Sequence, residues 1–228
     1  MSRLCVIPAR GGSKRIPRKN VRPFCGKPIL AYSIEAATST GLFDEVMVST
    51  DDGEIADVAR SLGASVPFLR DPGNADDRAP LAAVVLECLE RYATAGASFD
   101  SVLCLLATAP FATASRIADA YERFSAGGYD SFMPVVRFSF PILRAMRLSG
   151  DQVSMMWPEH RDTRSQDLEP AYHDSGTFYW IDVARFLEER AILMPKTGGM
   201  EIPETEAQDI DTEEDWRLAE LKFAARGE

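Results

Sequence analysis

The chain has 228 residues and a formal net charge of −10, and 46% of its residues are apolar. This size and composition suit one globular domain with a full core, while the acidic balance disfavours a nucleic-acid partner. No apolar run approaches the ~20 residues of a membrane-spanning helix, and the four cysteines lack a CxxC spacing, so we expect a cytoplasmic protein with reduced thiols and no membrane partner.

Short apolar segments alternate with helical patterns through the first 137 residues. Strands are predicted at 3–8, 45–50, 65–69, 101–106 and 131–137, and helices at 27–39, 53–62, 80–94 and 114–125. This alternation is typical of an α/β fold with a mostly parallel sheet between layers of helices. Ligands of such sheets bind beyond the carboxyl ends of the strands, where the loops after Ile7, Val48 and Leu106 fall.

The pattern changes near residue 138. Two hairpin-like segments, 143–148 and 152–157, are followed by a polar stretch without periodicity at 158–170. We expect residues 138–170 to form a small insertion within a single domain of residues 1–228, and to mediate a homodimer. A strand at 172–181, a helix at 182–190 and an amphipathic helix from Thr212 onward are predicted to complete the fold.

Positive charge is concentrated at the N-terminus. Eight Lys or Arg residues precede Glu35, the first acidic residue, whereas the rest of the chain holds 17 basic and 35 acidic residues. A strand, a double-glycine turn and clustered cations predict a phosphate-binding loop rather than a solvated basic loop. The segment matches neither Gly-x-x-x-x-Gly-Lys-Ser/Thr nor Gly-x-Gly-x-x-Gly, which disfavours a P-loop kinase and a dinucleotide dehydrogenase. Arg10, Lys14 and Lys19 are the cations that we expect at a triphosphate.

A pair of carboxylates lies close to the last predicted helix, in residues 208–215 (QDIDTEED). Asp209 and Asp211 are two apart on an extended segment, so they point to the same face and can share a hard cation. Thr212 and Asp215 match a capping box, which explains the residues after the pair but not the pair itself. We therefore expect Asp209 and Asp211 to bind Mg²⁺.

Several motifs together resemble the acylneuraminate cytidylyltransferases, which join CMP to nine-carbon 2-keto sugar acids. They are residues 7–20 (IPARGGSKRIPRKN), 49–52 (STDD) and 209–211 (DID), and the resemblance covers essentially the whole chain. Residues 107–111 (ATAPF), 164–167 (RSQD) and 172–180 (YHDSGTFYW) are similar to the pseudaminic acid branch, whereas sialic acid enzymes usually show QPTSP and RPNG. The resemblance implies a Rossmann-like nucleotide-diphospho-sugar transferase fold with three layers.

The resemblance also implies a role for each matching residue. The CTP-binding set would be Arg10, Gly11, Gly12, Ser13, Lys14, Asn20, Thr50, Asp51 and Arg70. The sugar-binding set would be Thr108, Arg144, Arg164, Gln166, His173 and Tyr179, and the catalytic set Arg10, Lys14, Lys19, Asp209 and Asp211, with Mg²⁺ on the two aspartates. A purely structural role on a strand is an equal alternative for His173. Residues 78–81 (RAPL) lack the hydroxyl that family members often have where cytosine is read, so backbone groups are expected to contribute there.

The implied reaction is nucleotidyl transfer. The anomeric hydroxyl of the sugar would attack the α-phosphorus of CTP and pyrophosphate would leave, which requires positioning and charge stabilisation rather than a covalent enzyme intermediate. A transferase acting on neuraminic, legionaminic or 3-deoxy-octulosonic acid is the near alternative. A non-catalytic nucleotide-binding protein of the same fold is the distant one.

Overall fold

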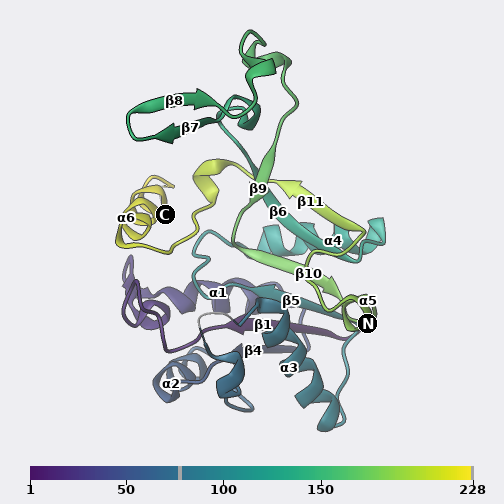
Figure 1. Ribbon diagram of the computed structural model, residues 1–228. Coiled ribbons are helices and arrows are strands. Elements are labelled where there is room, and N and C mark those ends of the chain that lie inside the picture. Colours follow the sequence, from purple (N-terminus) through teal and green to yellow (C-terminus); the bar gives the residue numbers. More distant parts are fainter. Residues whose placement is uncertain (77–78, 227–228) are drawn as a thin grey trace.

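A central sheet organises the molecule. In the computed structural model, which describes residues 1–76 and 79–226, seven strands form one sheet in the order β11-β6-β10-β5-β1-β4, with β9 added to β6 (Figure 1). The strands are β1 (Arg3–Pro8), β4 (Glu45–Ser49), β5 (Ser101–Leu105), β6 (Ser131–Arg137), β9 (Tyr172–Asp174), β10 (Phe178–Asp182) and β11 (Thr197–Glu201). β1 pairs in parallel with β4 and β5, and β11 with β6, whereas β10 and β9 run antiparallel to their neighbours.

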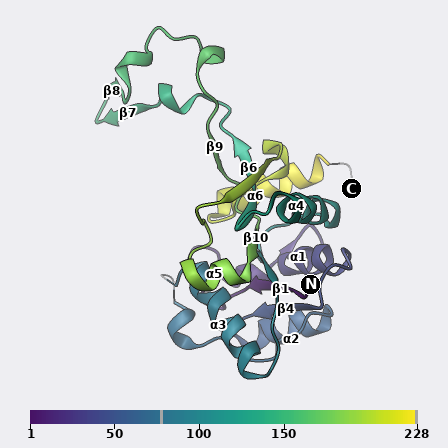
Figure 2. The ribbon, with the colours of Figure 1, turned by 90° about the vertical axis from the view of Figure 1, so that its right-hand side faces the viewer.

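Helices cover both faces of this sheet (Figure 2). The helices α1 (Ile29–Thr38), α2 (Gly53–Ser61) and α4 (Ala114–Gly127) pack on one face, and α3 (Leu81–Thr94) and α5 (Val183–Glu189) on the other. Within β1, Cys5 and Ile7 join the first of these cores while Leu4 and Val6 join the second. This two-residue alternation buries both faces of the strand. The predicted three-layer α/β architecture is therefore confirmed.

Four segments differ from the sequence expectations. The first helix begins at Ile29 rather than residue 27, because Lys27–Pro28 (β3) pairs with Pro23–Phe24 (β2). The expected strand at 65–69 was wrong: in the described chain this segment makes only an isolated bridge from Ser65 to Met47, and Pro67 has no N–H to extend it. The expected strand at 172–181 is two strands, β9 and β10. β11 was missed because its two glycines lower strand propensity.

Residues 138–170 leave the body of the molecule as a projecting arm (Figures 1 and 2). The arm holds a hairpin of β7 (Met146–Ser149) and β8 (Gln152–Met155) and the short 3₁₀ turns Ile142–Arg144, Pro158–His160 and Ser165–Asp167. Its apolar side chains include Phe140, which is 83% exposed, and the exposed Met146, Leu148 and Val153. An exposed apolar cluster of this kind commonly marks a protein contact.

The C-terminal helix α6 (Glu213–Ala224) packs against the N-terminal segment. Trp216 and Phe223 of α6 contact the ring of Phe24 at centroid distances of 5.5 Å each, in edge-to-face geometry. The guanidinium of Arg22 lies 4.4 Å from the Trp216 ring centroid. Thr212 and Asp215 form the capping box that was predicted for this helix. Two chain ends thereby share one small core.

Among the helices in residues 1–76 and 79–226, none has the length and apolar character needed to cross a bilayer.

Trp216→Ala is expected to lower the free energy of unfolding by about 3–5 kcal/mol, because a buried indole in this core would leave a cavity. Leu221→Ala is the matched control on the same helix: Leu221 is 70% exposed, so a change within about 0.5 kcal/mol is expected. Urea denaturation followed by circular dichroism measures both values. Equal effects of the two substitutions would show that α6 is not held by this core.

Candidate active site

The loop that follows β1 carries most of the predicted phosphate-binding residues. The turn between β4 and α2 fixes its first part: the amide N–H of Ala9 donates to the carbonyl of Ser49 at 2.9 Å, and that of Gly11 donates to Asp51 Oδ1 at 2.9 Å. Asp51 therefore anchors the start of the loop to the β4–α2 turn. Thr50 is fully buried and its Oγ1 accepts from the amide N–H of Asp52.

A steric constraint that is separate from phosphate binding favours glycine at position 11. A Cβ on this residue would lie 2.6 Å from Asp52 Oδ2 and 2.8 Å from Asp52 Cβ. Gly12, by contrast, is exposed and has no atom within 4 Å of an added Cβ. Gly11 thus permits close packing on Asp52, while Gly12 presents its backbone to solvent.

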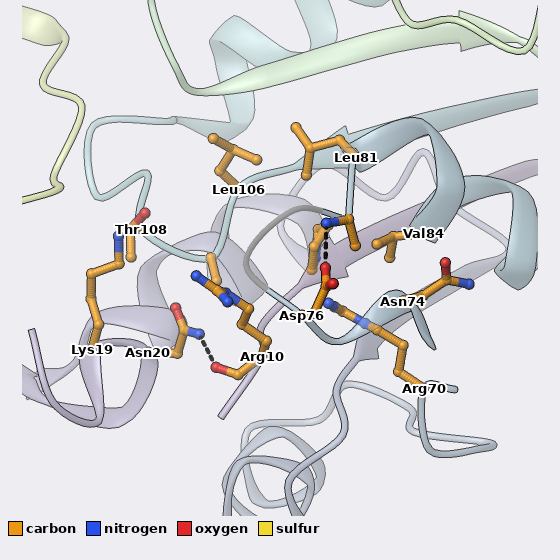
Figure 3. Close-up of a pocket in the computed structure, with 13 residues that line it drawn as sticks. Arg10, Lys19, Asn20, Arg70, Asn74, Asp76, Leu81, Val84, Leu106 and Thr108 are labelled. Carbon is orange, nitrogen blue, oxygen red and sulfur yellow. Dashed lines mark hydrogen bonds between the residues drawn. The ribbon is translucent and has the colours of Figure 1, made fainter. Parts of the chain in front are cut away.

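A first cavity lies at the carboxyl ends of β1 and β5 and has a volume of about 260 Å³ (Figure 3). Its lining comprises Pro8, Arg10, Lys19, Asn20, Arg70, Asn74, Asp76, Ala79, Leu81, Val84, Leu106, Ala107 and Thr108. Asn20 donates from Nδ2 to the carbonyl of Arg10 at 2.9 Å. The buried Arg70 donates from Nε to Ser49 Oγ at 3.0 Å. Burial lowers the pKa of its guanidinium group. The expected convergence of the loops after β1 and β5 is confirmed.

The second cavity, of about 300 Å³, is cationic. It is lined by Arg10, Ser13, Lys14, Arg15, Lys19, Asn20 and Asp211. Arg10, Lys19 and Asn20 also line the first cavity, so the two cavities adjoin. A nucleoside lying in the first cavity could extend its phosphates into the second, where the positive charge is concentrated.

Asp211, of the acidic pair, reaches this cationic cavity from the other end of the chain. Ile210 is fully buried in the core under α6, and on an extended segment this directs Asp209 and Asp211 away from that core. The Lys19 Nζ donates to the carbonyl of Ile210 at 2.6 Å and lies 3.6 Å from Asp211 Oδ1. Arg15 pairs with Asp211 Oδ2 at 2.9 Å. Burial lowers the pKa of Lys19, against the opposing effect of Asp211 and Asp209.

Asp209 and Asp211 also line a third cavity, of about 400 Å³, with His173, Asp174, Asp215 and Lys222. The pKa of Asp209 is raised, first by burial and then by the neighbouring negative charge of Asp211. Because Asp211 lines both the second and the third cavity, these two cavities adjoin at its side chain, and we call the three adjoining cavities the channel.

The predicted sugar-binding residues fall into two groups. Thr108 lines the first cavity, His173 lines the third, and the buried Tyr179 donates from its hydroxyl to Asp174 Oδ2 at 2.5 Å, with burial raising its pKa. The exposed His173 lies on β9 with its Nδ1 2.8 Å from the carbonyl oxygen of Asp174. The structure does not bring the second group to these cavities. Arg144, Arg164 and Gln166 are exposed on the projecting arm, where Arg144 donates to Ser165 Oγ at 3.3 Å.

Sequence reasoning missed several polar residues at this site. No local sequence pattern singled out Arg15 or Asp174. Folding brings Arg15 beside Asp211, and Asp174 beside Tyr179. Asn74 and Asp76 lie in the first cavity through a turn that the buried Glu87 holds: its Oε1 accepts from the Asp71 N–H, and its Oε2 from Asn74 Nδ2, both at 2.8 Å. In the segment expected near cytosine, residues 78–81, Arg78 lies outside the described residues, whereas Ala79 and Leu81 line the cavity.

Comparison with known proteins agrees with this geometry. Residues 4–179 match the sequence profile of a family described as cytidylyltransferase. The chain belongs to this family. It is 43% identical to a pseudaminic acid cytidylyltransferase of Campylobacter jejuni, over 100% of this chain and 99% of that one. It is 36% identical to a CMP-N,N'-diacetyllegionaminic acid synthase of Legionella pneumophila, over 95% and 94%.

A solved structure shares the fold of this cytidylyltransferase. It is a CMP:2-keto-3-deoxy-manno-octonic acid synthetase complexed with CTP, with a TM-score of 0.71 at 16% identity, covering 99% of this chain and 100% of that one. The prediction of a Rossmann-like nucleotidyltransferase fold and of a CTP-dependent enzyme is confirmed.

Gly11→Ala is expected to destabilise the cytidylyltransferase by about 1–3 kcal/mol, because the added methyl group must displace the Asp52 carboxylate. Gly12→Ala is the matched control and is expected to change the free energy of unfolding by less than about 0.5 kcal/mol. Chemical denaturation of both variants gives the comparison. A Gly11→Ala protein as stable as the wild type would contradict the close packing described.

Proposed function

We propose that this cytidylyltransferase transfers CMP from CTP to the anomeric hydroxyl of pseudaminic acid and releases pyrophosphate. The observation that supports nucleotide transfer most strongly is the meeting of the basic loop with Asp211 in the second cavity. The similarity to a pseudaminic acid cytidylyltransferase over the whole length of both chains supports the choice of sugar.

The nucleotide would lie with its base and ribose in the first cavity and its phosphates in the second. The anomeric oxygen then forms a bond to the α-phosphorus, the bond to the bridging oxygen of pyrophosphate breaks, and the hydroxyl proton leaves to solvent or base. Lys14 and Lys19 would stabilise the charge that develops on pyrophosphate. Arg10 lines both cavities and would bind where the ribose meets the phosphates. No covalent intermediate is required.

Asp209 and Asp211 have the chemistry of a Mg²⁺ site. Both donors are hard carboxylate oxygens, and burial together with the negative charge of Asp211 raises the pKa of Asp209, so a cation would offset the second of these effects. Within the described residues, no group of three or more His, Cys, Asp or Glu side chains could hold a metal alone. Mg²⁺ suits such a pair because it is commonly bound by one or two carboxylates with water and substrate phosphates. When bound, it would neutralise phosphate charge and acidify the attacking hydroxyl.

The sugar would lie beside the third cavity, near His173 and Tyr179, with Thr108 toward the nucleotide. The second group of sugar-binding residues requires a homodimer, in which residues 138–170 of one copy reach the channel of the other. Arg144 and Arg164 would then offer guanidinium groups to the sugar carboxylate. The exposed apolar side chains of the arm supply a surface for that contact.

We place the enzyme in the cytoplasm. Cys5, Cys88 and Cys104 are free and buried, and burial raises the pKa of the Cys88 and Cys104 thiols to about 12, so they would remain protonated. Free thiols are typical of reducing compartments. Recovery of the native protein in an oxidising compartment by cell fractionation would contradict this placement.

A panel of sugar acids tests the substrate. With CTP, pseudaminic acid is expected to give a kcat/KM at least about tenfold higher than N-acetylneuraminic, legionaminic or 3-deoxy-octulosonic acid, measured as pyrophosphate release, because each sugar places different substituents against the same polar groups. Turnover of N-acetylneuraminic acid but not of pseudaminic acid would reject the proposed sugar. Nucleotide binding without turnover of any sugar would favour the non-catalytic alternative.

Asp209→Asn and Asp211→Asn test the metal site. Each is expected to slow turnover on the order of a hundredfold or more, since a lost carboxylate weakens a cation that stabilises phosphate charge. Asp57→Asn is the matched control, because the Asp57 side chain is 81% exposed and pairs with Arg60 on the same helix, α2. Thermal midpoints and circular dichroism show whether the fold is intact. Unimpaired turnover in both site variants would exclude this role for the pair.

Light scattering tests the homodimer and is expected to give twice the chain mass of 25.1 kDa. Leu148→Asp on the arm is expected to shift this mass toward the monomer, because it places a charge in an apolar contact. The control is Leu193→Asp, which should leave the mass unchanged, because Leu193 is 64% exposed and lies outside the arm.

Mixed dimers test the shared site itself. Lys14→Ala and Arg164→Ala proteins, each with low activity alone, are expected to regain measurable activity when mixed, since one hybrid channel is complete. A protein that is monomeric and active would exclude the shared site.

A further inference from the structure

Arg18 has an unusual backbone conformation at the end of the phosphate-binding loop. Its φ and ψ are 56° and 28°, in the left-handed region that residues with a Cβ rarely adopt. The next two residues are Lys19 and Asn20, which line both the first and the second cavity. The left-handed turn at Arg18 therefore sets the direction in which these two side chains enter the channel.

The side chain of Arg18 points to the β4–α2 turn. Its NH1 and NH2 atoms donate to the two carboxylate oxygens of Asp52, at 2.6 and 3.2 Å, and NH2 also pairs with Glu54. The hydrogen bonds from Arg18 are the largest cause of the lowered pKa of Asp52. Arg18 is not among the residues that line the three cavities. Its charge is thus directed away from the second cavity, which Arg10, Lys14, Arg15 and Lys19 line.

Asp52 connects both ends of the loop to a rigid element. It is the N-cap of α2, where its Oδ1 accepts from the Ile55 N–H at 3.1 Å. The Cα of Gly11, at the start of the loop, packs against the same carboxyl group. A single helix-anchored carboxylate therefore fixes the loop at Gly11 and at Arg18, on either side of Lys14.

We propose that Arg18 is a positioning residue for CTP: its two-pronged ion pair with Asp52 holds the left-handed turn that presents Lys19 and Asn20 to the nucleotide. The inference rests on the proposed binding of CTP in this channel. A paired guanidinium offers two directional hydrogen bonds, which fix an orientation better than a point charge would. Asp52 acts with Arg18 and does not touch the nucleotide.

Substitutions at Arg18 separate backbone positioning from direct contact. Arg18→Ala removes the ion pair but keeps a Cβ, so the left-handed backbone conformation loses the contact that holds it and becomes unfavourable. The dissociation constant for CTP, measured by calorimetry without sugar, is expected to rise about tenfold. Arg18→Gly also removes the ion pair but adopts this conformation freely, so it is expected to recover much of that loss. A guanidinium that contacted phosphate would instead make the Gly and Ala variants equally weak.

Asp52→Asn supplies the reciprocal test. Asn remains a good N-cap for α2 but lacks the charge that pairs with Arg18, so CTP affinity is expected to fall as in Arg18→Ala. The double variant is expected to be no weaker than either single one, because both remove the same interaction. In steady state, the KM for CTP is expected to rise more than kcat falls. Arg123→Ala, which removes a surface pair with Asp119 on α4, is the control and should match the wild type.

The outcomes distinguish this inference from the proposed function. If the wild type binds CTP and Arg18→Ala binds it equally well, the inference is overturned and the function stands. A drop in thermal midpoint with unchanged CTP affinity would also overturn it, since Arg18 would then be only structural. If the wild type itself binds no CTP, the proposed function fails and the inference fails with it.

Discussion

The packing of α6 on the N-terminal segment is the constraint on which the site depends. Trp216 and Phe223 close a small core around Phe24, and Ile210 is buried in the same core. Because Ile210 points into this core, the extended chain directs Asp209 and Asp211 away from it, and Asp211 contacts the basic loop through Lys19. Residues that are about 190 positions apart in the sequence thus form one site. Hydrophobic packing supplies the energy for this, since ion pairs this exposed contribute little on their own.

The ion pairs at the site have a chemical consequence. Arg15 and Lys19 contact the two oxygens of Asp211, so this carboxylate is paired with two of the cations in the free protein. The Arg15–Asp211 pair is solvent-exposed, and such pairs are worth about 0–1 kcal/mol. A triphosphate and a divalent cation can therefore replace them at little cost, with the phosphates taking the cations and the metal taking the carboxylates. The free protein is preorganised for a ligand that combines negatively charged phosphates with a positively charged metal ion.

Local patterns predicted much of the fold and part of the site. The alternating apolar segments predicted the layered sheet, and the absence of acidic residues before Glu35 predicted the anion-binding loop. The pair Asp209 and Asp211 was singled out by its spacing and by the Mg²⁺ that a triphosphate requires. These signals are local in the sequence, and the structure brings Lys14, Lys19 and Asp211 to one cavity.

The missed features depend on contacts between distant segments. β11 has two glycines and exists because β6 offers an edge with which it pairs. The strand expected at 65–69 has the right composition, but Pro67 limits its pairing. Arg15, Arg18 and Asp174 gained their partners only on folding. The sequence predicted an insertion at residues 138–170, but not that it projects from the body of the molecule (Figure 1) and keeps Arg144 and Arg164 out of the three cavities.

The most direct test of the account is a crystal structure of the protein with CTP and Mg²⁺. The predicted result is a triphosphate within hydrogen-bonding distance of Lys14 and Lys19, and a metal ion coordinated by Asp209 and Asp211, with Arg15 released from Asp211. A triphosphate bound outside this channel, or a metal held by other side chains, would contradict the central claim that the packing of α6 assembles the site.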